Sequence, residues 1–452
     1  MGKIKKAFFC QICGTQHTQW QGQCNGCKDW NTIVEEIISK ETNELWKKDV
    51  TPSTSKTSPI QINEINVDLI PRFKSGDKEL DTVLGGGLVP GSVTLLGGEP
   101  GIGKSTLLLQ LALKIKKKVL YISGEESLHQ IKLRSNRIGF RNENCFILSE
   151  TEIQKIFHQL QDFNPHILII DSIQTLHSNK IESASGSVSQ IKASATELIH
   201  YAKKTNVPVI LVGHITKDGA IAGPKILEHM VDTVLQFEGD RNYIYRILRA
   251  KKNRYGAASE IGIYEMIANG LKQVVNPSKI LISEKDNKLS GHAIAAIIEG
   301  IRPLMIEVQA LVSTAVYGTP QRSSTGFNAK RLNMLLAVLE KRAGFSLNTK
   351  DVFINITGGM SVEDPALDLA VIAAILSSYN DISISEKICF AAEIGLSGEI
   401  RPIPKAEQRI QEAEKLGFKN LVISKYSKIN GVQNSIKIKY LSNVESLVKF
   451  LF

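Results

Sequence analysis

A phosphate-binding loop is the strongest chemical signal in this sequence. Residues 98–105 read GEPGIGKS and match the pattern GxxxxGK[ST]. An apolar stretch precedes the loop and an amphipathic stretch, 106–115, follows it, as a strand and a helix would. Glycines let backbone N–H groups close around phosphate oxygens, and the helix N-terminus adds positive potential. We therefore expect ATP to bind at Gly98, Glu99, Pro100, Gly101, Ile102, Gly103, Lys104, Ser105 and Thr106.

Lys104, Ser105 and Asp171 are placed to contact the phosphates or the Mg²⁺ ion bound beside them. Lys104 offers a positive charge to the β- and γ-phosphates, and Ser105 offers its hydroxyl to Mg²⁺. Asp171 ends the apolar stretch 166–172, where a carboxylate can serve the same ion. An Asp after an apolar run is often only a strand end, but the phosphate-binding loop favours the metal interpretation.

Hydrolysis also needs a group that orients the attacking water. Glu125 and Glu126 follow the apolar stretch 118–124, at the edge of the predicted sheet where ligands bind in such folds. We expect a catalytic carboxylate here. The alternative is a solvated pair at the start of the next helix.

Four of the six cysteines form two CxxC pairs near the N-terminus. The spacing predicts one tetrahedral Zn²⁺ site with thiolate ligands Cys10, Cys13, Cys24 and Cys27. Two redox pairs are the alternative, which the absence of a thioredoxin-like strand–helix context disfavours. Four ligands leave no open position, so the zinc should be structural.

Smaller expectations concern the residues around these cysteines and the remaining two. His17 is a spare ligand or, more simply, a surface residue, and Trp20 and Trp30 should pack over the small core. Cys145 and Cys389 have no partner in the sequence and are expected to be buried.

The elements that must position these residues form three folded segments. Apolar stretches at 92–98, 118–124, 166–172 and 207–213 alternate with helical stretches, which predicts a parallel α/β sheet. The expected organisation is a zinc ribbon, a Ser/Thr/Pro-rich flexible linker, an ATPase domain and a C-terminal α+β domain, at 1–34, 35–63, 64–275 and 276–452.

Composition narrows the class of protein without defining a partner. The 452 residues are 42% hydrophobic and 22% charged, which suits a globular protein and excludes a disordered chain or a coiled coil. The net charge of +10 is spread along the chain, so charge alone does not identify a nucleic-acid binder. The apolar stretch 367–376 is too short to span a bilayer, and no secretory or myristoylation signal is found, so we expect a cytoplasmic protein.

The stretch LDTVLGGGLVPGSVTLLGGEPGIGKST at 80–106 resembles the RecA/DnaB-type ATPase core. With the four cysteines, KNRYG at 252–256 and the C-terminal segment, the whole chain resembles the bacterial RadA (Sms) family. That resemblance implies a DNA-dependent ATPase of homologous recombination and repair that drives translocation or branch migration alongside RecA. It also implies a hexameric ring that binds single-stranded and branched DNA.

The resemblance assigns roles to particular residues. The first Glu after the Gly of ISGEES, Glu125, matches the catalytic carboxylate. Lys252 and Arg254 match cations that reach the ATP of a neighbouring subunit or couple hydrolysis to DNA movement, although Tyr255 stands where the family has Phe. From the residues alone, a basic strand end on a solvated face is the simpler interpretation of this motif.

A loop that contacts DNA in RecA-like proteins corresponds to the segment 213–240. His214, Thr216 and Lys217 are candidates to contact phosphate or sense nucleotide, and Gly219 and Gly223 would supply mobility. A plain surface loop is the alternative for each of these residues.

The segment from about residue 280 resembles the proteolytic domain of Lon. Ala366 stands at the nucleophile position and Glu407 at the lysine position, so we expect no peptidase activity. The candidate DNA-phosphate contacts, or simply solvated charges, are Arg302, Lys330, Arg331, Lys341 and Arg342. Two other functions remain open, a KaiC-like regulatory ATPase module and an ATP-dependent protease.

Overall fold

The computed structural model describes residues 5–10, 14–38, 61–64, 72–214, 226–239, 245–258, 260–274, 276–282, 289–315, 319–429 and 435–452. It divides into two compact units. The first comprises Met1–Glu238 and Arg246–Gln273, and the second comprises Gly239–Tyr245 and Val274–Phe452. Within the described residues, no helix is both long and apolar enough to cross a membrane.

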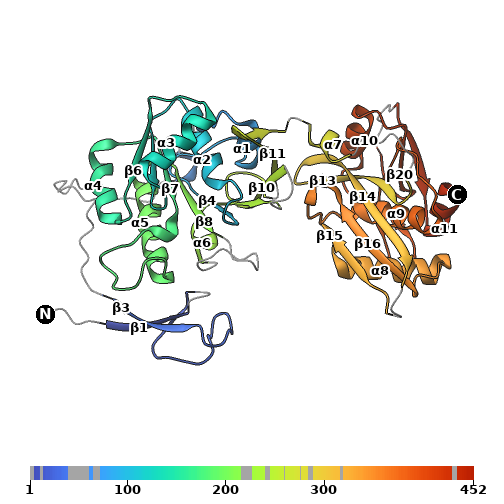
Figure 1. The fold of residues 1–452 in the computed structure, drawn as a ribbon, viewed down its shortest axis with the longest axis horizontal. Helices are drawn as coiled ribbons and strands as arrows, with labels where there is room; N and C mark the ends of the chain where they lie inside the picture. The colour runs from blue at the N-terminus through green and yellow to red at the C-terminus, as the bar shows by residue number, and fades with distance from the viewer. Residues whose placement is uncertain are drawn as a thin grey trace. The chain divides into compact units, whose positions relative to one another are not determined.

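The N-terminal segment is a small antiparallel sheet of β1 (Lys5–Cys10), β2 (Gln16–His17) and β3 (Ile33–Ile38), in the order β2-β1-β3 (Figure 1). Strand β3 pairs with the full length of β1, from Ile33 opposite Cys10 to Ile38 opposite Lys5. The strand pairing therefore continues to Ile38, past residue 34, where we expected the zinc ribbon to end.

The core of the first unit is a nine-stranded sheet in the order β12-β11-β10-β9-β4-β8-β7-β5-β6. Its parallel strands are β4 (Val93–Gly98), β5 (Val119–Ser123), β6 (Cys145–Ser149), β7 (Ile167–Asp171), β8 (Val209–His214) and β9 (Thr233–Glu238). The four expected strands are all present. The remaining strands, β10 (Tyr245–Asn253), β11 (Ile261–Ile267) and β12 (Gly270–Gln273), extend the sheet through antiparallel β9–β10 and β11–β12 pairs.

Helices cover both faces of this sheet, as continuous apolar strands require (Figure 1). Alternate residues face opposite layers, so Leu96 and Tyr121 join one buried cluster while Leu95 and Leu120 join the other. The helices of the first face are α1 (Lys78–Val83), α2 (Lys104–Lys114) and α3 (Leu128–Ile138). Those of the second are α4 (Ile153–Phe163), α5 (Val188–Thr205) and the short α6 (Ile226–Met230).

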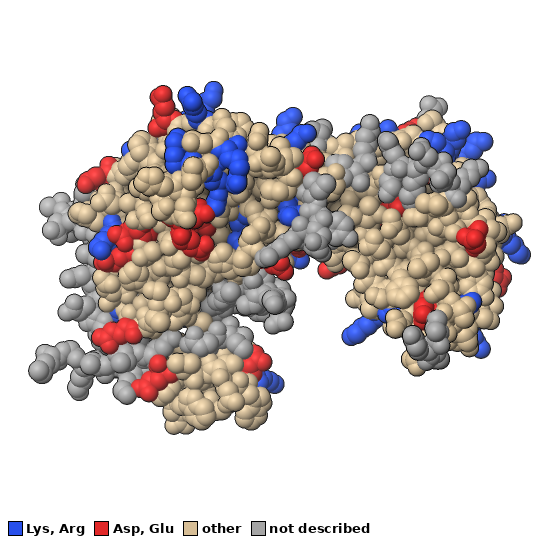
Figure 2. Space-filling view, in the orientation of Figure 1, with Lys and Arg blue, Asp and Glu red and all other residues tan. Residues whose placement is uncertain are grey.

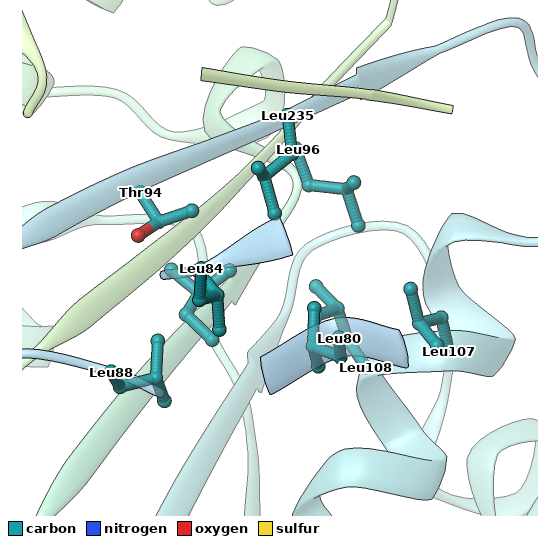
Figure 3. Close-up of a pocket in the computed structure, with 9 residues that line it drawn as sticks. Leu80, Leu84, Leu88, Thr94, Leu96, Leu107, Leu108 and Leu235 are labelled. Atoms are coloured by element: carbon teal, nitrogen blue, oxygen red, sulfur yellow. The ribbon is translucent and has the colours of Figure 1, made fainter. Parts of the chain in front are cut away.

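An apolar cavity of about 10 Å³ lies between α1, α2 and the sheet (Figure 3). Its lining is leucine-rich and consists of Leu80, Leu84, Leu88, Thr94, Leu96, Leu107, Leu108, Ile210 and Leu235. A space of this size barely admits one water molecule. We therefore treat it as a packing void and not as a ligand site.

The C-terminal unit is a seven-stranded mixed sheet in the order β15-β16-β14-β13-β17-β20-β21. Its strands are β13 (His292–Glu299), β14 (Arg302–Thr314), β15 (Arg322–Thr325), β16 (Lys350–Ile356), β17 (Ile388–Ala391), β20 (Asn420–Ser424) and β21 (Lys437–Leu441). A separate pair joins β18 (Glu393–Ile394) to β19 (Ile400–Arg401). The helices are α7 (Pro277–Ile280), α8 (Ala329–Ala343), α9 (Asp368–Asn380), α10 (Ala406–Lys415) and α11 (Val444–Leu451). This alternation of strands and helices matches the expected α+β class.

Candidate functional site

The phosphate-binding loop connects the central strand β4 directly to α2. Gly103 has φ +117°, and a Cβ there would lie 2.9 Å from the Met266 side chain. A Cβ at Gly98 would lie 2.9 Å from the carbonyl oxygen of Phe237. Gly103 is therefore required by its left-handed φ, and Gly98 by the close approach of the Phe237 backbone.

Lys104 is buried at the start of α2 and is held by the loop itself. Its ammonium donates to the carbonyl oxygens of Gly98 at 2.6 Å and Glu99 at 2.9 Å. Burial lowers the pKa of Lys104 to about 8, against the opposing effect of nearby carboxylates, chiefly Asp171. The loop therefore keeps a cation next to its own backbone donors, which is what a polyphosphate requires.

Asp171 ends β7, and its carboxylate fits a magnesium ion. Its Oδ2 accepts a hydrogen bond from the buried Tyr121 hydroxyl at 2.5 Å. Its Oδ1 is buried and accepts no hydrogen bond within the described part of the chain. A buried carboxylate oxygen without a donor is costly unless a cation meets it. Ser105, the other expected Mg²⁺ contact, lies half-buried in the first turn of α2.

Glu125 follows β5 and carries two hydrogen bonds on one carboxylate oxygen. Its Oε1 accepts from Ser172 Oγ at 2.5 Å and contacts His214 Nε2 at 2.9 Å. The bond to His214 and that to Ser172 lower the pKa of Glu125 to about 2, so the carboxylate is ionised at neutral pH. Glu126 instead pairs with Arg134, and Ser127 caps α3. Glu125 and Glu126 thus have different partners, and neither of them caps α3.

His214, at the end of β8, connects the lysine and the glutamate. Its Nδ1 lies 3.3 Å from Lys104 Nζ. Because an ammonium can only donate, Nδ1 is the acceptor, and the ring proton lies on Nε2, from which it is donated to Glu125. Sequence reasoning named His214 as a candidate contact to phosphate or sensor of nucleotide, but it did not predict this bridge between Lys104 and Glu125. The residues Thr216, Lys217, Gly219 and Gly223 of the candidate DNA loop lie outside the described residues.

Sequence reasoning missed two residues of this site, Ser172 and Tyr121. Ser172 directly follows Asp171, and Tyr121 lies on β5, the strand paired with β7. Only the register of β5 and β7, which sets Ser123 opposite Asp171, brings their hydroxyls to the carboxylates. The one available signal was a hydroxyl residue, Ser172, directly after Asp171, the residue that we expected to serve Mg²⁺.

Lys252 and Arg254 lie at the other end of the sheet. Strand β10 runs antiparallel to β9, so Lys252 pairs with Val234 and Asn253 pairs with Thr233. The backbone N–H of Arg254 donates to the carbonyl of Asp232. The N–H of Asp232 in turn donates to the carbonyl of Val93, which is the first residue of β4. Val93 is five residues before Gly98, roughly 16 Å along a strand. These cations are therefore not brought together with the phosphate-binding loop of the same chain.

The two cations differ in their contacts. The Lys252 ammonium donates to three backbone carbonyls at the end of α6, those of Glu228, His229 and Val231, at 2.8 to 3.2 Å. The Arg254 side chain is 57% exposed and bonds Asp232 at 3.3 Å. The Arg254 side chain is accordingly the more accessible of the two.

Asp232 and Tyr255 complete the surroundings of this motif. The Asp232 carboxylate is buried and also binds Lys203 at 2.7 Å. The Tyr255 hydroxyl, the group that the family's Phe lacks, lies 3.3 Å from Lys203 Nζ. The extra oxygen is thus used in a local polar contact.

The cysteine cluster has the geometry of a thiolate zinc site. The sulfurs of Cys10, Cys24 and Cys27 lie within 4.8 Å of one another, with Cys10 and Cys27 3.6 Å apart. Tetrahedral thiolates about 2.3 Å from zinc would lie roughly 3.8 Å apart. Cys13, the fourth expected ligand, lies outside the described residues.

Two expectations near the zinc site are wrong. His17 is not a surface residue, because β1–β2 pairing buries it with Nε2 3.5 Å from Cys24 Sγ. Trp20 and Trp30 do not pack over the small core, since they are 58% and 69% exposed on irregular segments. Of the other cysteines, Cys389 is buried as expected, while Cys145 on edge strand β6 is only half-buried.

In the C-terminal unit, the position expected for a nucleophile is part of the core. Ala366 is fully buried, close to a buried ion pair between Asp364 and Arg409 at 2.7 Å. Asp364 Oδ1 also accepts a hydrogen bond from Ala366 N–H. Glu407, at the expected lysine position, lies in the first turn of α10 and is half-buried. The arrangement contains neither a nucleophile nor an amine at these positions.

The candidate DNA contacts of this unit are not equivalent. Arg331 forms a two-bond ion pair with the buried Asp368, so its guanidinium serves the fold. Lys330, Lys341 and Arg342 are exposed on α8, and Arg302 is half-buried on β14. On the face drawn in Figure 2, basic side chains are scattered toward the edges of this unit and form no continuous patch.

A phosphate-binding loop after the central strand, with carboxylates following the neighbouring strands β5 and β7, defines a RecA-like P-loop ATPase. The DNA repair protein RadA of Bacillus subtilis (strain 168) is 46% identical over 426 residues, which cover 94% of this chain and 93% of the relative. DNA repair protein RadA of Streptococcus pyogenes serotype M6 is 43% identical over the full length of both chains. The chain therefore belongs to the RadA family.

Family models match three separate segments. Residues 61–220 match the AAA domain, residues 8–35 the rubredoxin metal binding domain, and residues 307–427 subunit ChlI of Mg-chelatase. The first two fit ATP and zinc as cofactors. The third describes the segment that we expected to resemble Lon. Among solved structures, the RadB recombinase and a KaiC-like protein from Pyrococcus horikoshii OT3 each have a TM-score of 0.38, at 22% and 21% identity, covering 45% of this chain and 99% of theirs.

Proposed function

We propose that this DNA repair ATPase is a ring-shaped motor, a homo-hexamer, that uses ATP hydrolysis to translocate DNA and drive branch migration at recombination intermediates alongside RecA. Its DNA partners are single-stranded and branched DNA. One observation carries the proposal: Lys104, Asp171 and Glu125 surround one end of the sheet, while Arg254 lies exposed near the other end. If Arg254 completes the ATP site of a neighbouring subunit, its distance from the phosphate-binding loop of its own chain is explained.

Each residue at the site has a chemical role under this proposal. The backbone of residues 98–106 and Lys104 bind the ATP phosphates, and Ser105 and Asp171 hold Mg²⁺. When bound, Mg²⁺ neutralises charge on the β- and γ-phosphates. Glu125 orients the attacking water and accepts its proton, while Arg254 of the neighbouring subunit stabilises charge in the transition state.

Lys252 has a different part in this scheme. Its ammonium binds backbone carbonyls at the end of α6, a helix that lies within the candidate DNA-contacting segment 213–240. Movement of that segment on DNA would therefore be felt at Lys252 and at the adjoining Arg254. We accordingly assign Lys252 to the coupling of hydrolysis with DNA movement.

The rest of the chain supports the ring in this proposal. The ribbon is a docking module with a structural zinc. Most of the expected linker, 35–63, lies outside the described residues. The C-terminal domain from residue 276 is a scaffold whose exposed cations, Lys330, Lys341 and Arg342 among them, contact DNA phosphates. We place the protein in the cytoplasm, where RecA and chromosomal DNA are found in bacteria.

Mixed rings test completion of the site by a neighbour. Lys104→Ala and Arg254→Ala should each reduce ATP turnover, the latter by about 10³-fold, as expected for an arginine finger. A mixture of the two variants should recover a substantial part of the activity, because some interfaces join an intact loop to an intact Arg254. An absence of recovery in rings shown to contain both variants would contradict the proposal.

Stimulation by DNA separates the motor from a regulatory module. Turnover should rise with single-stranded DNA, and Lys252→Ala should lose the stimulation while retaining basal turnover. A KaiC-like module predicts turnover that is indifferent to DNA and unaffected by Lys252→Ala.

We also propose that the C-terminal domain has no peptidase activity. Even the double variant Ala366→Ser, Glu407→Lys should not hydrolyse casein, because residue 366 is buried beside the Asp364–Arg409 pair. Casein hydrolysis by the unmodified protein would instead support the protease alternative.

A further inference from the structure

The carboxylate of Glu125 is anchored on one side only. Both of its hydrogen bonds, from Ser172 and His214, are made to Oε1. No residue in the described ranges donates to Oε2, and the side chain is 39% exposed. The two oxygens are therefore chemically distinct, one held by the protein and the other open to a water molecule.

The two donors differ in how firmly they are held. His214 also contacts Lys104, whose ammonium must leave the carbonyls of Gly98 and Glu99 to meet phosphate. The His214 contact therefore depends on where Lys104 lies. Ser172 makes no contact with Lys104 among the hydrogen bonds of the described residues, and its side chain is fully buried.

The backbone around Ser172 fixes its hydroxyl relative to Glu125. The Ser172 carbonyl accepts hydrogen bonds from the N–H and the hydroxyl of Thr175. Gly124 N–H donates to the Asp171 carbonyl at 3.0 Å, which ties the turn before Glu125 to the end of β7. The end of β7 thus carries the Asp171 carboxylate and, on the next residue, the Ser172 hydroxyl that holds Glu125.

We infer that Ser172 is a positioning residue for ATP hydrolysis, which holds Oε1 of Glu125 so that Oε2 faces the attacking water. Because Ser172 directly follows Asp171, the same strand end sets the place of the carboxylate that serves Mg²⁺ and of the one that serves the water. A misplacement of about 1 Å at such a group can cost roughly 100-fold in rate. This inference rests on the proposed role of Glu125.

A double-mutant cycle tests the inference. Single-turnover hydrolysis of radiolabelled ATP would be measured for Ser172→Ala, Glu125→Gln and the double variant, together with KM for ATP and the Mg²⁺ concentration for half activation. Ser172→Ala should lower the rate about 10- to 100-fold, leave KM and the Mg²⁺ dependence within about threefold, and have less than a twofold effect once Glu125 is replaced. Ser172→Thr, which retains a hydroxyl, should recover most of the rate.

The controls separate positioning from folding. Ser194→Ala removes an equally buried serine of α5 outside the site and should not change the rate. Thermal unfolding of each variant shows whether it folds, and only the rates of folded variants enter the double-mutant cycle.

Three outcomes would overturn the inference. An unchanged or raised rate in Ser172→Ala would mean that the bond is dispensable or holds Glu125 in an inactive position. An equal loss in the Glu125→Gln background would mean that Ser172 acts through another group, and a shifted Mg²⁺ requirement would point to Asp171. Full turnover by Glu125→Gln alone would instead refute the proposed role of Glu125, so the two failures are distinguishable.

Discussion

At the scale of single residues, Lys104 combines burial with a charge that the chemistry needs. Its ammonium is held by backbone carbonyls of the same loop, and burial lowers its pKa to about 8. The amine is charged below that pH and becomes neutral above it. Because only the charged form pairs with phosphate, ATP affinity should depend on pH in a range that is easily measured.

We predict that ATP affinity is constant below about pH 8 and falls above it, by up to about tenfold per pH unit. The dissociation constant of a fluorescent ATP analogue between pH 7 and 9.5 gives the measurement. Lys104→Arg, whose guanidinium stays charged, should remove this dependence even if its affinity is lower. A wild-type affinity that does not change across this range would contradict the prediction.

Sequence reasoning could name the candidate site residues that belong to local motifs. The loop at 98–106, Asp171 and Glu125 could be named because each follows an apolar strand. Ser172 and Tyr121 could not, because their roles depend on which strands are neighbours and in what register. His214 was named as a possible phosphate contact or nucleotide sensor, but its bridge between Lys104 and Glu125 became visible only in the fold.

At the scale of elements, the turn between β5 and α3 has little space. A Cβ added at Gly124 would lie 2.1 Å from Thr175 Oγ1 and 2.7 Å from Thr175 Cβ. Real Cβ atoms do not approach so closely, so the turn that carries Glu125 would have to move.

Gly124→Ala should therefore lower both stability, by about 1–3 kcal/mol, and the rate of ATP hydrolysis. The double variant Gly124→Ala, Thr175→Ala should recover part of both, since it removes the clashing atoms. Gly139→Ala is the matched control, because a Cβ there meets no atom within 4 Å and only the φ of +82° is strained. Full activity in Gly124→Ala would show that the turn does not position Glu125.

The parallel part of the sheet could be predicted from apolar runs, but its antiparallel extension could not. The β10–β12 strands lack the βαβ spacing that marks a parallel neighbour. Their direction is what takes Lys252 and Arg254 to the end of the sheet away from the phosphate-binding loop. The motif KNRYG could be recognised in the sequence, while its distance from the site became visible only in the fold.

At the scale of the whole molecule, the net charge of +10 per chain is modest and spread out. A hexameric ring would repeat it around one axis and create a strongly positive channel without a strongly basic domain. The proposal thus explains how a C-terminal unit whose basic side chains form no continuous patch on the face drawn in Figure 2 can contribute to DNA binding.

DNA affinity should consequently fall steeply with salt, and only in the assembled ring. Between 50 and 200 mM salt, we expect single-stranded DNA to lose about 300-fold or more in affinity if the ring meets six or more phosphates. Fluorescence anisotropy with labelled single-stranded DNA, combined with mass measurements of the bound species, would test this. Single subunits that bind DNA as tightly, with the same salt dependence, would contradict the ring.

The central claim is that hydrolysis at Glu125 moves DNA strands, and branch migration measures it directly. RecA-made D-loops with a labelled invading strand would be incubated with ATP and either the wild-type protein or Glu125→Gln, and strand extension would be followed with time. The account predicts ATP-dependent extension by the wild-type protein and none by Glu125→Gln, although that variant still binds ATP and DNA. Equal extension by both proteins, or none by the wild-type protein under conditions in which it hydrolyses ATP, would contradict the account.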